Sequence, residues 1–114
     1  MAIVDTSSEP ESILNPDLEP LSVLSEKYQC RIFGSVEELL GDPEIGPNLD
    51  GVMVVTPHAT HYSIGKELLK VVNFRKTNKG KPLHIMMEKP MTVDIDDAIN
   101  LLMAHQKLFP QCLI

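Results

Sequence analysis

The chain has 114 residues, enough for one compact domain and too few for two of ordinary size. Hydrophobic residues make up 43% and charged residues 23%, as in a globular protein rather than a disordered chain. The formal net charge of −6 argues against a surface for nucleic acid or for an anionic membrane. No membrane span or signal peptide is evident, and Cys30 and Cys112 fit neither a metal knuckle nor a disulfide framework. We therefore expect a reduced, cytoplasmic protein.

Short apolar runs predict the strands of a parallel sheet. Residues 2–4, 52–55 and 83–87 are continuously apolar rather than alternating, which is typical of strands covered on both faces. Residues 30–33 and 112–114 are weaker strand candidates.

Helical patterns lie between these runs. Apolar residues recur at helical spacing in three segments: Leu21, Leu24 and Tyr28; Ile64, Leu68, Val71 and Val72; and Ile95, Ala98, Ile99 and Leu102. Pro20 suits the first turn of the first helix, and Thr92 is the expected N-cap of the last. Ser35 and Glu38 form a capping box, and the short helix after Ser35 should end near residues 41–43.

The regular alternation of strands and helices predicts an α/β domain, with a parallel sheet and right-handed crossovers. Two segments are expected to be surface loops. Residues 7–19 carry two prolines among acidic and small polar residues, and residues 73–82 are strongly basic. A basic cluster could bind a phosphate, but a solvated loop is the preferred interpretation of residues 73–82.

Polar and ionisable residues follow three of the predicted strands. Asp5 follows the first, residues 56–61 (TPHATH) the second, and residues 88–90 (EKP) the third. In open parallel sheets, ligands bind beyond the carboxyl ends of the strands. The sequence therefore predicts a ligand site at this edge, although strand ends are often polar in any case.

Two of these positions have a specific chemical interpretation. Asp5 corresponds to the acidic residue that ends the second strand of a Rossmann fold, where a carboxylate accepts both ribose hydroxyls and repels the extra phosphate of NADP. An ordinary turn residue is the alternative, and the more frequent one when Asp5 is considered alone. Thr56 offers a hydroxyl near the ligand edge, and Pro57 stiffens the turn.

The histidines give little evidence for a metal. His58 and His61 are three residues apart, but without another well-spaced Cys or His ligand they support a zinc site only weakly. His84 is expected in a core or interface, and His105 needs no special role. Lys89 stands out more, because a lysine directly after a buried strand can hydrogen-bond a substrate hydroxyl or carbonyl. An exposed turn lysine is the alternative.

Several common motifs for phosphate binding and catalysis are absent from this sequence. Its six glycines are isolated, and no two form G-x-G, so the glycine-rich turn that approaches a pyrophosphate is absent. There is also no G-x-S-x-G elbow and no P-loop, so hydrolase and NTPase functions have no motif in their favour.

Taken together, these motifs resemble one known family. The matching segments are residues 26–28, 33–40, 50–61 and 87–92, and they include a strand ending in T-P-x-x-x-H and a later strand ending in E-K-P. The chain resembles the N-terminal NAD(P)-binding Rossmann domain of the glucose-fructose oxidoreductase and inositol dehydrogenase family (Gfo/Idh/MocA). The similarity covers most of residues 21–107.

The resemblance implies roles for individual residues. Thr56, Pro57 and His61 would line the dinucleotide cleft, whereas Glu88 and Pro90 would shape the turn beside the nicotinamide ribose. These five would thus be cofactor-binding residues.

The resemblance also implies an activity. Lys89 would be catalytic, assisting proton transfer while hydride moves between NAD or NADP and a sugar, polyol or related hydroxyl compound. Asp5 matches the ribose position less securely, because the proline-rich stretch after it is longer than the family's usual turn. No metal, nucleic acid or membrane partner is expected. A homo-oligomer is compatible with the sequence.

The family's first strand and glycine-rich turn should precede Asp5, and its substrate domain should follow Ile114. We therefore expect residues 1–114 to be an incomplete Rossmann-type domain that is inactive alone. In the strand order 3-2-1-4-5-6, the missing strand would lie between residues 2–5 and 52–55. Either these strands pair directly, another chain fills the gap, or the sequence is part of a longer protein. The alternatives to an enzyme are a non-catalytic nucleotide-binding or regulatory module and a structural protein with chance motifs.

Overall fold

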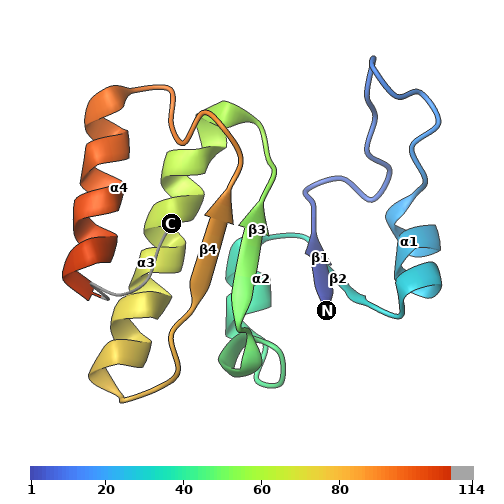
Figure 1. Cartoon of the computed structure of the whole chain (residues 1–114). Coiled ribbons are helices and arrows are strands. Elements are labelled where there is room, and N and C mark those ends of the chain that lie inside the picture. The colour runs from blue at the N-terminus through green and yellow to red at the C-terminus, as the bar shows by residue number, and fades with distance from the viewer. Residues whose placement is uncertain (109–114) are drawn as a thin grey trace. The chain divides into compact units, whose positions relative to one another are not determined.

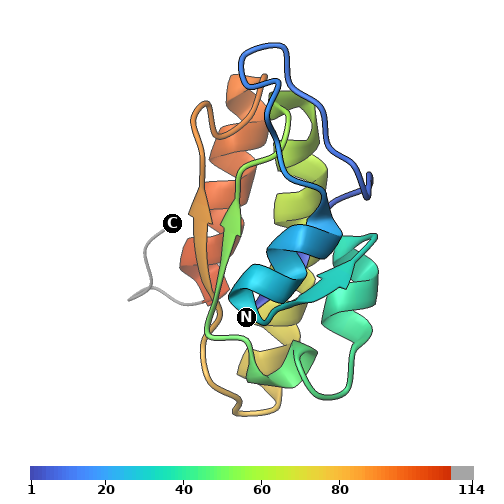
Figure 2. The same ribbon diagram turned by 90° about the vertical axis from the view of Figure 1, so that its right-hand side faces the viewer.

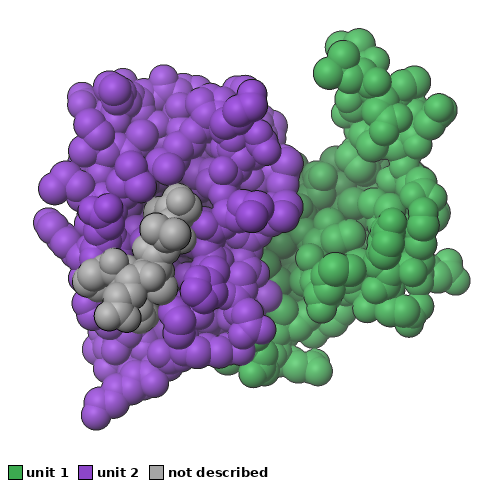
Figure 3. Space-filling view, in the orientation of Figure 1, with its two compact units in different colours: residues 1–48 green, residues 49–114 purple. Residues whose placement is uncertain are grey.

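A computed structural model describes residues 1–108, which belong to two compact units, Met1–Asn48 and Leu49–Ile114 (Figure 3). The helices and strands alternate as the sequence predicts, and the strand candidate at residues 112–114 lies outside the described residues. In chain order the elements are β1 (Ala2–Val4), α1 (Leu21–Tyr28), β2 (Arg31–Phe33), α2 (Val36–Gly41), η1 (Gly46–Asn48), β3 (Gly51–Val54), η2 (His58–Thr60), α3 (His61–Thr77), β4 (His84–Met87) and α4 (Ile95–Leu108).

The described strands form two parallel pairs, one in each unit. β1 pairs with β2 from Ala2↔Arg31 to Val4↔Phe33, and β3 pairs with β4 from Gly51↔His84 to Val54↔Met87. The predicted α/β class and its parallel pairing are therefore confirmed.

The first unit packs two short helices against β1 and β2. α1 buries Leu21 and begins after Pro20, which lies at the N-cap rather than inside the first turn. At α2, the Ser35 hydroxyl accepts the Glu38 N–H at 3.1 Å, and the Glu38 carboxylate accepts the Gly34 N–H at 2.9 Å. The predicted capping box is thus confirmed. Its Glu38 carboxylate accepts the N–H of Gly34, the residue before the N-cap Ser35, rather than the N–H of Ser35 itself.

The loop between β1 and α1 contains neither helix nor strand over residues 7–19, as predicted. Ile13 and Leu14 near its middle are 100% and 96% exposed. They lie among acidic residues and prolines, so this loop contributes almost nothing to the apolar core.

The second unit contains the large side chains that are fully buried among the described residues. α3 and α4 lie side by side and cover one face of the β3–β4 pair (Figures 1 and 2). Leu68, Val72 and Leu83 have no exposed surface. A Cβ atom on Gly65 would lie 3.0 and 3.1 Å from the two methyl groups of Leu101, so this glycine allows α3 and α4 to approach closely.

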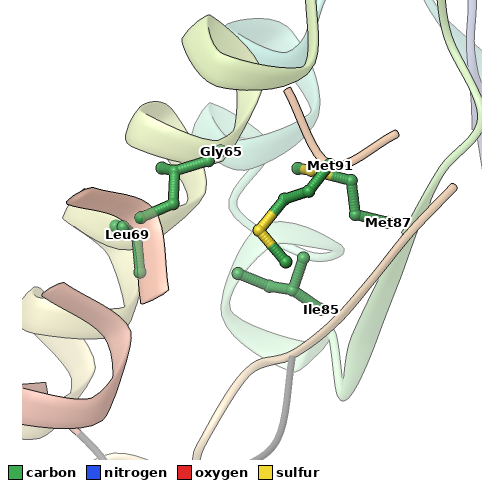
Figure 4. A pocket seen from close by; sticks show the side chains of 6 residues that line it. Gly65, Leu69, Ile85, Met87 and Met91 are labelled. Carbon is green, nitrogen blue, oxygen red and sulfur yellow. The ribbon is translucent and has the colours of Figure 1, made fainter. Parts of the chain in front are cut away.

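A small void lies beside Gly65 (Figure 4). Its volume is about 10 Å³, so it is a packing defect too small for an organic ligand. It is lined by Gly65, Leu69, Ile85, Met87, Met91 and Leu101.

The basic segment at residues 73–82 is helical over its first half, so its prediction as a loop is wrong for residues 73–77. α3 continues to Thr77 because Arg75 turns inward and donates to the Leu49 carbonyl at 2.6 Å. The helix then ends where Lys79 adopts a positive φ of 56° and the Gly80 N–H bonds the Arg75 carbonyl at 2.7 Å.

The predicted N-cap of α4 is also wrong. The Asp94 carboxylate, rather than Thr92, accepts the N–H groups of Asp96 and Asp97, at 2.9 and 3.3 Å. Thr92 is buried, and its hydroxyl donates to the Asp94 carbonyl instead. Within residues 1–108, no helix is both long and apolar enough to cross a membrane.

Candidate functional site

The turns after β3 and β4 leave the sheet side by side. The Glu88 N–H donates to the Val54 carbonyl at 2.9 Å, which continues the pairing past the end of β4. Thr56 and Lys89 therefore both lie at the carboxyl edge of this strand pair, as the sequence predicts for a ligand site. The peptide bond between Lys89 and Pro90 is cis.

His61 connects these two turns from inside the protein. Its ring has no exposed surface, and it stands at the first position of α3. Nδ1 lies 2.8 Å from the Pro90 carbonyl oxygen, and Nε2 lies 2.8 Å from the Thr56 carbonyl oxygen. The structure thus places His61 beneath the two turns, where it contacts their backbones.

The contacts of His61 also weaken the case for a metal. Both ring nitrogens are directed at carbonyl oxygens, so neither is directed at a metal position shared with His58, whose ring lies 5.8 Å away. Among residues 1–108, no cluster of three or more His, Cys, Asp and Glu side chains is arranged to hold a metal ion.

The hydroxyl of Thr56 is supported by a second threonine. Thr60 Oγ1 lies 2.7 Å from Thr56 Oγ1 and 2.7 Å from the Pro57 carbonyl oxygen. Because a hydroxyl has one proton, Thr60 donates to only one of them at a time. The sequence reasoning missed Thr60, although a threonine four residues after Thr56, just before a helix, was the available signal.

Lys89 is exposed in the turn after β4, between the exposed residues Glu88 and Pro90. Its ammonium group makes no hydrogen bond or ion pair with any residue that the structure describes. A lysine held in place by its backbone but without an internal partner can donate to a ligand at this edge.

Asp5 belongs to the first unit, directly after the end of β1. Its N–H donates to the Phe33 carbonyl at 3.2 Å, which extends the β1–β2 pair, and its Oδ1 accepts the Ser7 N–H at 2.9 Å. This is an Asx turn, so Asp5 does have the turn role considered as the alternative. Because Oδ1 bonds Ser7, Oδ2 is the oxygen better placed for a ligand.

The two units carry opposite net charges. Residues 1–48 contain ten Asp and Glu against two Lys and Arg, whereas residues 49–114 contain six against eight. Lys27 is the first cation after the N-terminus, so the segment around Asp5 has no Lys or Arg side chain near it in sequence.

Comparison with known families supports the motif-based expectation. Residues 2–112 match the model of an oxidoreductase family with an NAD-binding Rossmann fold, GFO_IDH_MocA. The chain belongs to the Gfo/Idh/MocA family. Among proteins with curated functions, none matches this sequence significantly.

This Gfo/Idh/MocA chain is also similar to two crystal forms of UDP-N-acetylglucosamine 3-dehydrogenase GnnA from Acidithiobacillus ferrooxidans. The first has a TM-score of 0.63 and 23% identity, over 94% of this chain and 27% of that one. The second has a TM-score of 0.58 and 26% identity, over 81% and 24%. The chain therefore spans about a quarter of the length of these dehydrogenases.

Proposed function

We propose that this chain forms part of a nicotinamide-dependent oxidoreductase that moves hydride between the cofactor and a hydroxyl-bearing carbon of a sugar, polyol or related compound. The observation that carries the proposal is the meeting of the two family motifs at one edge of β3–β4. There, His61 bonds both turns, and Lys89 has no partner among the described residues.

The residues at this edge suit the nicotinamide half of the cofactor. Thr56 supplies a half-buried hydroxyl, and Glu88, Lys89 and Pro90 form an exposed turn beside it. The sequence has no glycine-rich turn for the pyrophosphate, so the fit covers the nicotinamide and ribose ends only.

In the proposed reaction, the bound cofactor supplies the hydride acceptor or donor. The Lys89 Nζ hydrogen-bonds the reacting oxygen of the substrate and takes up or returns its proton. Thr56, held by Thr60, orients the substrate or cofactor through its hydroxyl. This assignment makes Lys89 the catalytic residue and Thr56 a binding residue.

We further propose NAD rather than NADP. The carboxylate of Asp5 suits the two ribose hydroxyls, and the acidic residues of the loop at 7–19 would repel a 2′-phosphate. Residues 1–26 contain no Lys or Arg to compensate for that repulsion.

The proposed substrate class is supported by the similar dehydrogenase, whose name describes oxidation of a sugar at position 3. Because this chain spans about a quarter of that protein, turnover is proposed for a larger protein containing this sequence rather than for the 114 residues alone.

The test is a titration of the isotope-labelled chain with NAD and with NADP, followed by NMR. We expect amide shifts at residues 56–61 and 88–91 and near Asp5, and weaker binding of NADP. Lys89→Met should reduce the shifts at the turns, whereas Lys79→Met should not, because Lys79 precedes β4 rather than following it. Shifts confined to residues 73–82, or equal effects of the two variants, would contradict the proposed site.

A further inference from the structure

The chemistry of His61 goes beyond lining a cofactor cleft. Its two ring nitrogens both lie 2.8 Å from carbonyl oxygens, which only accept hydrogen bonds. A neutral imidazole has one N–H and can donate to one of them; the other nitrogen would direct its lone pair at a carbonyl oxygen. An imidazolium donates to both.

The two carbonyl groups share this ring as a hydrogen-bond partner. Within residues 1–108, no other donor bonds the Thr56 or Pro90 carbonyl oxygen. The ring itself is fully buried, so its two nitrogens have these carbonyl oxygens rather than bulk water as partners. Buried donors and acceptors are almost always paired, so one side chain satisfying two carbonyls from two turns is a specific arrangement.

We propose that His61 is a positioning residue, whose ring links the turn at Pro90 through Nδ1 to the turn at Thr56 through Nε2. It fixes the backbone on each side of the ligand edge, and so it sets where Lys89 and the Thr56 hydroxyl lie relative to each other. The proposal concerns the free chain and does not depend on a cofactor.

The charged and titratable groups nearest to the ring belong to η2 and to the turn after β4. His58, on η2, faces it with its ring edge-on at 5.8 Å, and the exposed Glu88 and Lys89 immediately precede Pro90 in the turn after β4. Glu88 is the acidic group of that turn. Bonds to two carbonyl dipoles partly replace the solvation that the ring loses on burial.

The first test is nitrogen-15 NMR of the histidine rings in the intact chain at neutral pH. The His61 signals are assigned by their loss in His61→Gln. We expect a protonated ring nitrogen with a scalar coupling across its hydrogen bond to the carbonyl carbon of Thr56 or of Pro90. A ring without coupling to either carbonyl would overturn the proposal.

The second test separates positioning from folding. His61→Phe keeps a ring but removes both donors, whereas His61→Asn keeps one amide donor. We expect His61→Phe to shift the amides of residues 56–60 and 88–91 together, and His61→Asn to restore one turn only. His58→Phe, on the neighbouring exposed ring, is the matched control and should leave residues 88–91 unchanged. Amide shifts limited to one turn in His61→Phe would overturn the proposal. If His61→Phe does not fold, the nitrogen-15 signals of the His61 ring in the unmodified chain test the proposal instead.

Discussion

The two compact units differ in how much core supports them. Residues 1–48 contain three-residue strands and helices of eight and six residues, whereas residues 49–108 contain four-residue strands and helices of 17 and 14 residues. Every fully buried large side chain among the described residues belongs to the second unit: Leu68, Leu83, His61, His105 and Val72. The turns proposed to bind the nicotinamide thus rest on the better-packed unit, and the acidic Asp5 segment rests on the weaker one.

The largest expected effect comes from removing core volume in the second unit. Leu68→Ala should lower its free energy of unfolding by about 2–5 kcal/mol, because the side chain is fully buried and leaves a cavity. Urea unfolding followed by amide signals from both units measures this. Leu14→Ala, at a position that is 96% exposed, should change stability by less than about 0.5 kcal/mol. An equal loss of unfolding free energy in Leu68→Ala and Leu14→Ala would contradict the difference in packing between the two units.

A smaller effect is expected from overpacking the helix contact. Gly65→Val should destabilise the second unit by about 1–3 kcal/mol, since even a Cβ atom there lies 3.0 Å from a Leu101 methyl group. Gly41→Ala, at the end of α2 in the first unit, is the matched control. No atom lies within 4 Å of its Cβ position, so it should cause no loss. Thermal unfolding of both variants checks the pair.

The first unit depends more on local bonds. Ser35→Ala removes the acceptor for the Glu38 N–H and should cost about 1 kcal/mol, confined to residues 1–48. Ser35→Asp, which keeps a side-chain acceptor, should recover most of that loss. Amide hydrogen exchange in both units provides the measurement. Faster exchange in α3 of Ser35→Ala would contradict the expectation that the loss of stability is limited to the first unit.

The smallest effect is a difference in pH dependence. The pKa of His105 is lowered, first by burial and second by the nearby charge of His84. The unfolded chain therefore binds a proton more readily, and the second unit loses stability as the pH falls from about 6.5 through the lower folded pKa. Urea midpoints at pH 7.5 and 5.5 should show this loss, and His105→Gln isolates it from the other three histidines. A slope unchanged in His105→Gln would contradict it.

The first unit should respond at a lower pH, since residues 1–48 contain no histidine. The pKa of Asp42 is lowered, first by the Ile45 N–H and then by Arg31. Its contribution to stability is present above about pH 4 and is lost as the pH falls through the lower folded pKa. Asp42→Asn should remove this acid sensitivity from the first unit while leaving the response of His105 unchanged.

Much of the fold could be predicted from local patterns. Apolar runs, helical spacing and the Ser35–Glu38 capping box depend on neighbouring residues, and residues 1–108 contain the elements predicted within them. The predictions failed where a distant contact decided the outcome. Arg75 extends α3 by bonding Leu49, 26 residues away, and Asp94 rather than Thr92 caps α4 because the Thr92 side chain is buried.

The site was predictable to a similar extent. Parallel pairing brings strand ends together, so the motifs alone indicated that the turns containing Thr56 and Lys89 would meet. The orientation of His61 could not be obtained in this way, because spacing does not tell whether a side chain points outward to a ligand or inward to backbone carbonyls. Thr60 was missed for the same reason, since its role depends on a hydroxyl pair that only the three-dimensional structure shows.

The register of β3 with β4 has a further consequence for the chemistry of the edge. Val54 pairs with Met87, so Thr56 and Lys89 are each the second residue after the last pair of the register. A slip of one residue in β4 would place Glu88 or Pro90 level with Thr56 instead. The slip would replace a cation by an anion or by a side chain without charge. The alignment of two four-residue strands therefore determines the sign of the charge at the proposed ligand edge, and the proposed function requires that insertions between them leave that alignment intact.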